Sequence, residues 1–192
     1  ITLVFILYNA ANYSSISFHG TYQINELGFS LKLISFIAIT GSVSRILFSR
    51  FWGKYADKRS FSNMIEKCFI VLGIGYLCYV FATPKTGIYA VIGYTLLHGI
   101  AMGGINSALT NLVFDYVTPD KRSDSLAICQ AASGVVGFVS TLLVSPLVSY
   151  IQNSSNTFLG IPIYAQQVLS ILSCILTVVA IIYVRTVLIK KR

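Results

Sequence analysis

Long apolar runs alternate along the chain with short polar connections. A helix needs about 20 mostly apolar residues to cross a bilayer, and the pattern predicts six such segments. Their predicted bounds are 1–24, 31–53, 63–83, 87–116, 123–150 and 163–189. The connections are short and rich in Pro, Gly, Asn and Ser, as turns require. Consecutive helices should therefore be antiparallel neighbours, and residues 1–192 should form one all-α bundle of six transmembrane helices.

Composition supports a membrane protein. Hydrophobic residues make up 55% of the chain and charged residues only 10%. A soluble domain carries roughly 25% charged residues, so this chain has too little charge to cover a surface in water. Its net charge of +8 would suggest a nucleic-acid partner only on a soluble fold with a basic face. Because the cations flank the apolar segments instead, we expect a lipid bilayer around the protein and no nucleic acid.

The positions of the cations predict which end of the bundle faces the cytoplasm. Eleven Lys and Arg residues fall on one side of the predicted topology and two on the other. The larger set is Arg50, Lys54, Lys58, Arg59, Lys67, Lys121, Arg122, Arg185, Lys190, Lys191 and Arg192, and the smaller is Lys32 and Lys85. Since Lys and Arg are concentrated in cytoplasmic loops, the crowded side, with the Ile1 and Arg192 ends, is expected in the cytoplasm.

A glycine and an acid lie within the most basic connection, in the sequence GKYADKR. Topology requires cations there, but it requires neither Gly53 nor Asp57. A carboxylate at this point could accept N–H bonds from the start of another helix, where the helix dipole favours negative charge. The glycine would let that neighbour approach closely. The pair therefore suggests a contact between helix ends.

This segment resembles the loop signature of the major facilitator superfamily, G-x-x-x-D-(R/K)-x-G-(R/K)-(R/K). Gly53, Asp57 and Lys58 match it, whereas Ser, Phe and Ser at 60–62 replace the later glycine and cations. The departures are typical of the weaker second copy, between helices eight and nine, and DYVTPDKRS (115–123) resembles the turn between helices ten and eleven. The chain thus resembles helices seven to twelve, one half of a twelve-helix bundle. Its opening, ITLVF without Met, also suggests a fragment whose N-terminal half is missing.

The resemblance implies a secondary transporter that moves a small solute by alternating access. The missing half of the same protein would be a partner, a proton or other ion a coupling species, and a bacterial plasma membrane the location. It also implies a cytoplasmic gate in which Asp57 caps the start of the fifth helix, near 122–125. The expected gate residues are Gly53, Asp57, Lys58, Arg59, Asp115 and Arg122. The alternative is a solvated loop, since exposed ion pairs often contribute under about 1 kcal/mol.

The first predicted helix carries an unusual number of polar residues. At about 100° per residue, four of them fall within about 80° of arc and two flank that arc. The four are Asn9, Asn12, His19 and Gln23, and the flanking pair is Tyr13 and Ser15. Lipid does not tolerate such a stripe. It should line a water-filled cavity on the substrate path, as the resemblance also implies, or form hydrogen bonds between helices.

The fourth predicted helix has a second polar face, formed by Tyr94, Thr95, His98, Met102 and Asn106. The resemblance implies that this helix also lines the path, which makes Tyr94, His98, Met102 and Asn106 the expected substrate contacts. Gly99 and Gly103 are spaced for close helix packing. His98 lies near the expected midplane and could relay a proton or serve as a hydrogen-bond partner.

Arg45 lies inside the second predicted helix. It could extend to the headgroups, or it could face the cavity and favour an anionic substrate group.

No catalytic, cofactor or metal constellation is readable. The four cysteines lie in apolar runs without accompanying His or Asp and are expected to be buried hydrophobes. An enzyme, a metal site and a cofactor are therefore not expected. Two alternatives to a secondary transporter stay open: the membrane domain of an ATP-driven transporter, and a non-transporting assembly subunit.

Overall fold

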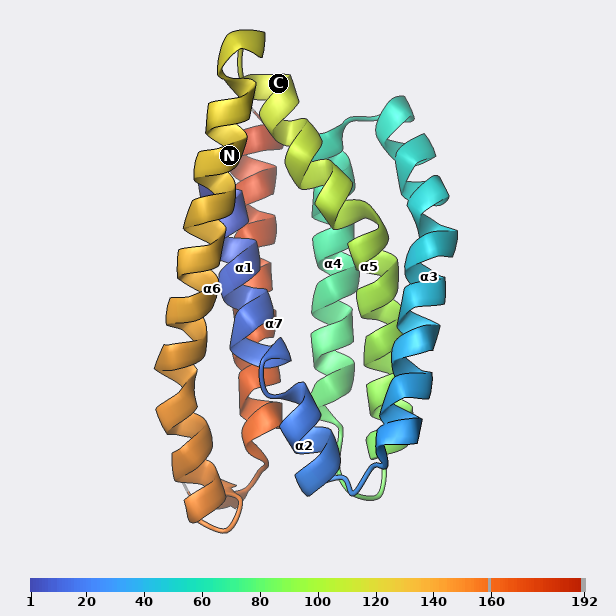
Figure 1. The fold of residues 1–192 in the computed structure, drawn as a ribbon, viewed down its shortest axis with the longest axis vertical. Helices are drawn as coiled ribbons and strands as arrows, with labels where there is room; N and C mark the ends of the chain where they lie inside the picture. The colour runs from blue at the N-terminus through green and yellow to red at the C-terminus, as the bar shows by residue number, and fades with distance from the viewer. Residues whose placement is uncertain (159, 191–192) are drawn as a thin grey trace.

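The structure is a computed structural model that describes residues 1–158 and 160–190. It is a bundle of long helices (Figure 1), joined by short turns, one 3-10 turn and one small β-hairpin. The elements are α1 (Thr2–Ile16), α2 (His19–Asn25), α3 (Leu31–Lys58), α4 (Phe61–Val80), α5 (Gly87–Tyr116), η1 (Pro119–Lys121), α6 (Arg122–Asn153), β1 (Thr157–Phe158), β2 (Ile161–Pro162), α7 (Ala165–Tyr183) and the π-helical η2 (Val184–Ile189).

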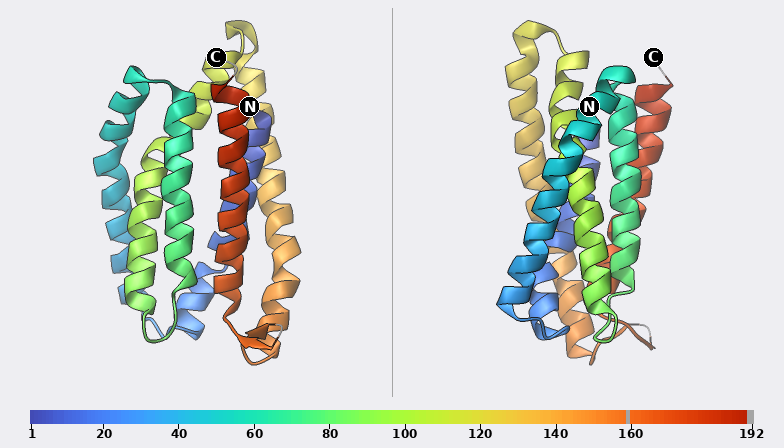
Figure 2. Two further views of the ribbon diagram at one scale, coloured as in Figure 1. Left: turned by 180° about the vertical axis from the view of Figure 1, so that it is seen from behind. Right: turned by 90° about the vertical axis from the view of Figure 1, so that its right-hand side faces the viewer.

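The helices form two groups of three. In one group α5 packs against both α3 and α4, and in the other α1 packs against both α6 and α7. Contact between α4 and α7 joins the groups. In the right-hand view of Figure 2, α4 and α7 lie on one side of the molecule and α3 and α6 on the other. We call the side formed by α1, α3, α5 and α6 the front face.

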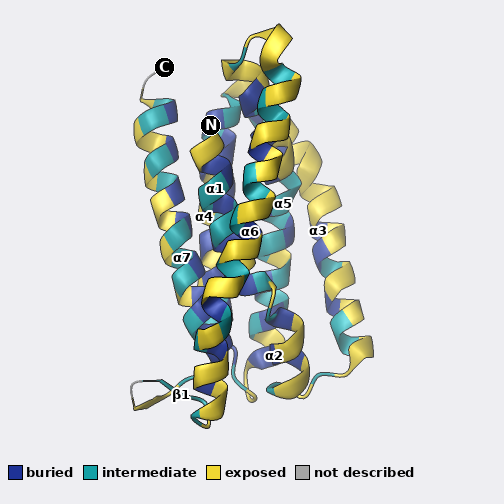
Figure 3. Ribbon diagram, turned by 60° about the vertical axis from the view of Figure 1, so that its left-hand side comes forward, coloured by how far each residue is buried: buried dark blue, intermediate teal, exposed yellow. Residues whose placement is uncertain are grey.

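Burial follows this arrangement. In the most apolar stretch of α4, 56% of the residues are buried, against 17% in the corresponding stretches of α3 and α6. Figure 3 shows α6 and α3 largely exposed along their length. Their exposed apolar side chains include Phe36, Ile39, Val43, Ile46 and Leu47 on α3 and Ile128, Val135, Phe138, Leu142 and Leu143 on α6. Soluble proteins rarely expose apolar patches this continuous, so lipid or another apolar partner must cover these helices.

Five of the described helices are long and apolar enough to cross a membrane: α3, α4, α5, α6 with η1, and α7 with η2. The predicted bounds of the fourth segment, 87–116, agree with α5. The second segment was predicted to end at 53, but α3 continues to Lys58, so Gly53 and Asp57 lie inside a helix rather than after one.

The first predicted segment, 1–24, is two helices rather than one. α1 ends at Ile16 and α2 begins at His19. The Ser17 hydroxyl donates to the Tyr13 carbonyl oxygen at 3.0 Å, a local bond that competes with regular helix geometry. From α7, the side-chain amide of Gln166 donates to the Ser15 hydroxyl at 2.7 Å and to the Ser15 carbonyl oxygen at 3.4 Å. These bonds supply partners for polar groups at the break.

Glycines set the spacing where α3 crosses α5. A Cβ atom on Gly99 would overlap the backbone of Gly41, and one on Gly103 would lie 2.9 Å from the carbonyl oxygen of Arg45. A Cβ atom on Gly41 would lie 2.7 Å from the methyl group of Thr95. Backbones this close require glycine, and the predicted packing role of Gly99 and Gly103 is confirmed.

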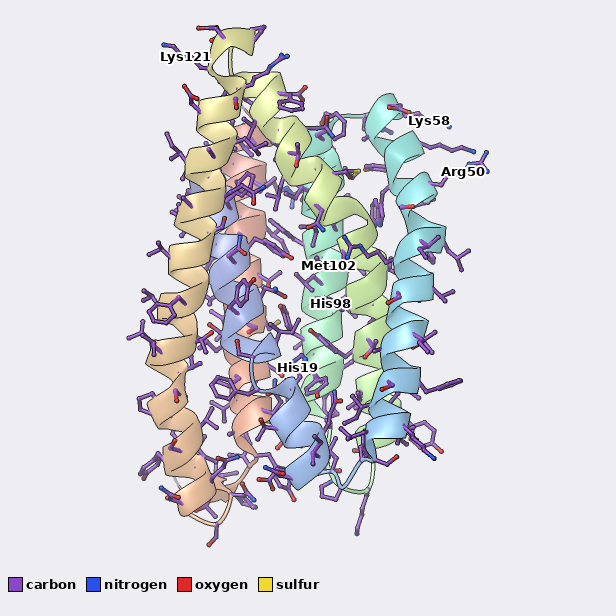
Figure 4. The ribbon with its side chains drawn as sticks, viewed as in Figure 1. His19, Arg50, Lys58, His98, Met102 and Lys121 are labelled. Atoms are coloured by element: carbon purple, nitrogen blue, oxygen red, sulfur yellow. The ribbon has the colours of Figure 1, made fainter. Side chains whose placement is uncertain are left out.

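The turns divide between two ends of the bundle. The chain start, the α3–α4 turn, η1 and η2 lie at one end, which we call the basic end (Figure 1). Figure 4 shows Lys58 and Lys121 there, with Arg50 nearby on α3. The α2–α3 connection, the α4–α5 turn and the β-hairpin lie at the opposite end. This agrees with the predicted sidedness of the connections, and Lys191 and Arg192 lie outside the described residues.

Candidate substrate pathway

Two of the hollows on the front face are lined by residues that the sequence analysis singled out. The first, which we call the α1–α6 hollow, lies between α1, α5 and α6 and has a volume of about 300 Å³. Its lining residues are Phe5, Tyr8, Asn9, Asn106, Leu109, Thr110, Gln130 and Ser133. The structure thus brings two predicted residues, Asn9 on α1 and Asn106 on α5, into one polar space.

Gln130 and Ser133, both on α6, line this hollow but were missed by sequence reasoning. Gln130 carries an amide within an otherwise apolar run, and this is the signal that could have identified it. An uncharged amide of this kind inside a membrane segment favours a protein or water contact over lipid.

The second hollow, the α3–α5 hollow, has a volume of about 190 Å³. Its lining residues are Ala38, Gly41, Ser42, Arg45, Thr95, His98, Gly99 and Met102. Arg45 is exposed and lies near the middle of α3. At about 100° per residue, it points about 150° away from the exposed apolar stripe of the same helix. The structure therefore places the Arg45 guanidinium in a hollow with His98 and Met102.

Two side-chain contacts connect α1 to α5 between these hollows. The Tyr8 hydroxyl donates to the Met102 sulfur at 3.0 Å. The Nε2 atom of His98 lies 3.4 Å from the Asn12 side-chain oxygen. Figure 4 shows His98 and Met102 at successive levels beside α1. Tyr8 and Met102 each line one hollow, so their contact separates the two spaces.

The rest of the polar stripe is packed inside the bundle. Ser15, His19 and Gln23 are buried. The Ser15 hydroxyl lies 2.9 Å from His19 Nε2, and the Gln23 amide donates to the Tyr79 hydroxyl at 3.2 Å. The His19 ring stacks on Tyr79 with centroids 4.6 Å apart. None of these three residues lines either hollow, and their polar groups meet other buried side chains of the bundle.

Two further predicted pathway residues also differ from expectation. Tyr94 is buried, with its ring edge-on to His19 at 4.9 Å, and its hydroxyl has no hydrogen-bond partner among the described residues. Tyr13 is 41% exposed and covers Gly137 of α6, where a Cβ atom would lie 2.7 Å from the tyrosine ring. Tyr94 therefore belongs to the core, and Tyr13 packs α1 against α6.

The predicted gate contact is not formed within this chain. α6 begins without a side-chain cap, and Asp57 makes no hydrogen bond or ion pair among the described residues. Arg122 instead donates to the carbonyl oxygens of Phe114 at 2.8 Å and Val117 at 3.2 Å. The physical reason is that α3 and α6 occupy opposite edges of the front face (Figure 1). The remaining expected gate residues, Gly53, Lys58, Arg59 and Asp115, are exposed at the basic end.

One carboxylate is buried near the start of α4. Glu66 on α4 is 6% exposed. Its oxygens lie 3.6 Å from Lys67 Nζ and 3.9 Å from Arg185 Nε of η2. The ion pair between Glu66 and Arg185 connects α4 to η2, which follows α7, on the side away from the hollows.

Long helices that are apolar enough to cross a membrane define an integral, multi-pass membrane protein. Residues 1–191 match the model of the Major Facilitator Superfamily, and the chain belongs to that family. Membership identifies a membrane transporter, and transporters of this family bind small-molecule substrates, in some cases together with an ion. No curated protein matches the chain.

Proposed function

We propose that this chain is the C-terminal six-helix half of a secondary active transporter that moves a small solute by alternating access. The observation that carries the proposal is the pair of polar hollows on the front face, lined by α1, α3, α5 and α6. The back of the molecule, at α4 and α7, is packed and apolar. A second half placed over the front face would enclose both hollows and turn them into one path.

The exposed stripes of α3 and α6 support such a partner. They flank the hollows at the two edges of the front face, and their apolar side chains would pack against matching helices of an N-terminal half. Within this arrangement Asn9, Asn12, His98, Met102 and Asn106 are the proposed pathway residues, and His98 is the candidate for relaying a coupling proton.

For the cytoplasmic gate, we propose a partner for Asp57 other than the start of α6. Asp57 is exposed in the last turn of α3, where the helix dipole disfavours a carboxylate. Because no partner within the described chain offsets that cost, we place its partner on the other half of the transporter. The basic end, with Lys58, Arg59, Asp115 and Arg122, would then close against that half on the cytoplasmic side of a bacterial plasma membrane.

Cysteine labelling tests the proposal without knowledge of the substrate. The full-length protein, with its native cysteines replaced by alanine, carries either Asn106→Cys or Ile175→Cys. Asn106 is exposed in the α1–α6 hollow, whereas Ile175 is 56% exposed on α7 at the back of the molecule. A membrane-impermeant maleimide is applied to inverted and to right-side-out vesicles.

A maleimide reacts with the thiolate, which forms in water and not in lipid. We expect Asn106→Cys to react, faster in inverted vesicles, and Ile175→Cys to stay unlabelled. Equal labelling of the two positions, or no labelling of Asn106→Cys from either side, would contradict a wetted path on the front face.

A further inference from the structure

We infer that the transported solute is a soluble organic or phosphate anion, and that Arg45 binds its charged group in the α3–α5 hollow. The inference rests on the proposed transport function and adds the chemical class of the substrate. It depends on the position of Arg45 in the hollow, on the groups around its guanidinium, and on the lack of an acidic side chain among the residues that line the hollow.

Arg45 has no counter-ion in the part of the chain that the structure describes. Among the described residues, no carboxylate lies within 4 Å of its guanidinium, and the ion pairs of the molecule connect Glu66 to Lys67 and Arg185 instead. Arg45 also makes no hydrogen bond within that part of the chain. An unpaired cation at the depth of the bilayer interior is expensive, and such residues pair with one another or mark the path of a charged ligand.

The surroundings of Arg45 suit an anion. The residues that line the α3–α5 hollow include the hydroxyl side chains of Ser42 and Thr95, and no acidic residue is among them. A guanidinium presents donors in a planar fork that matches a carboxylate or phosphate group. The Thr95 hydroxyl adds a further donor to the same oxygens, whereas the Ser42 hydroxyl donates to the Ala38 carbonyl oxygen at 3.2 Å. The Arg45 guanidinium and the nearby hydroxyl donor, together in one hollow, are therefore suited to bind one small anionic group.

The size of the hollow indicates which part of the solute it holds. At about 190 Å³, it is smaller than the roughly 300–1,000 Å³ of sites that enclose a whole drug-sized ligand. We assign it to the charged group alone. The uncharged remainder would extend past Tyr8 and Met102 into the α1–α6 hollow, where Asn9 and Asn106 offer amide groups.

Thermal unfolding of the purified full-length protein in detergent tests this inference. Acetate, succinate, citrate and inorganic phosphate are compared with glucose and choline at constant pH and ionic strength. At least one of the anions should raise the unfolding midpoint in a saturable manner, whereas glucose and choline should not. Arg45→Gln should weaken that anion's binding about tenfold or more, the loss expected for a charge-assisted hydrogen bond.

Arg50→Gln is the matched control. Arg50 lies on the same helix, also exposed, but does not line the hollow, so its replacement should leave anion binding unchanged. If Arg45→Gln does not fold, Arg45→Lys serves in its place. That variant keeps the charge but loses the fork, so anion binding should weaken.

Several results would overturn the inference. These are stabilisation by none of the four anions, an equal effect in wild type and in the Arg45 variant, or stabilisation by phosphatidylglycerol alone. The last would assign Arg45 to a lipid headgroup. The labelling of Asn106→Cys distinguishes this failure from failure of the transport proposal. If Asn106→Cys is labelled but no anion binds, the protein is still a transporter, and its solute is uncharged or cationic.

Discussion

Gly99 of α5 lies directly against the backbone of Gly41 of α3, with no room for a Cβ atom between them. The contact occurs beside Arg45 and His98, which line the same hollow. Close packing of these two glycines therefore sets the distance between the helices that carry the candidate anion site. Any side chain at this crossing would push α3 away from α5.

Gly99→Ala should consequently destabilise the protein, while Gly93→Ala on the same helix should not. A Cβ atom on Gly93 meets nothing within 4 Å. Overpacking a core typically costs about 1–3 kcal/mol, whereas replacing glycine by alanine at an open helical site contributes up to about 1 kcal/mol of stability. The measurement is the thermal unfolding midpoint of each variant in detergent. Equal midpoints for the two variants would show that the crossing is looser than the structure indicates.

Gln166 has a comparable role at the break between α1 and α2. Its amide donates to the Ser15 hydroxyl at 2.7 Å, and both residues are buried. Gln166→Leu leaves polar groups of the break without a donor, and an unsatisfied buried group costs about 1–3 kcal/mol. We expect the unfolding midpoint to fall.

Gln152→Leu is the control for this experiment, since Gln152 is an exposed glutamine at the end of α6. It should unfold at the wild-type temperature. A Gln166→Leu protein as stable as this control would mean that the break does not depend on α7.

The break also shows why part of the fold could not be predicted. Hydrophobic periodicity located the spans well, and the bounds of α5 agree because a turn with Pro and Gly precedes an uninterrupted apolar run. Next to the interruption after Ile16, Ser15 accepts a hydrogen bond from Gln166, which is 151 positions away. A local pattern contains no information about a partner at that distance.

For the candidate pathway, the sequence indicates polar positions but not the neighbours of each side chain. Periodicity places Asn9 and His19 on one side of a single predicted helix, but the two residues lie in different helices, α1 and α2, and have different neighbours. Asn9 meets the α1–α6 hollow, whereas His19 meets the Tyr79 ring. Two positions on one predicted stripe thus have different surroundings.

Asp57 offers a test of the proposed gate that does not require a known substrate. It has no partner among the described residues, so Asp57→Asn removes no hydrogen bond or ion pair within this part of the chain. If its partner lies on the other half of the transporter, removing the charge should weaken closure at the basic end. Maleimide labelling of Asn106→Cys from the cytoplasmic side should then become several-fold faster.

Asp124→Asn provides the comparison, because Asp124 is an exposed acid in the first turn of α6, at the same end of the bundle. Asp124→Asn changes the net charge of the protein by the same amount as Asp57→Asn, but it removes no proposed contact between the two halves. Faster labelling in Asp57→Asn than in Asp124→Asn would support a gate at Asp57. Equal rates would indicate that the charges at the basic end determine orientation in the membrane and have no part in closing the path.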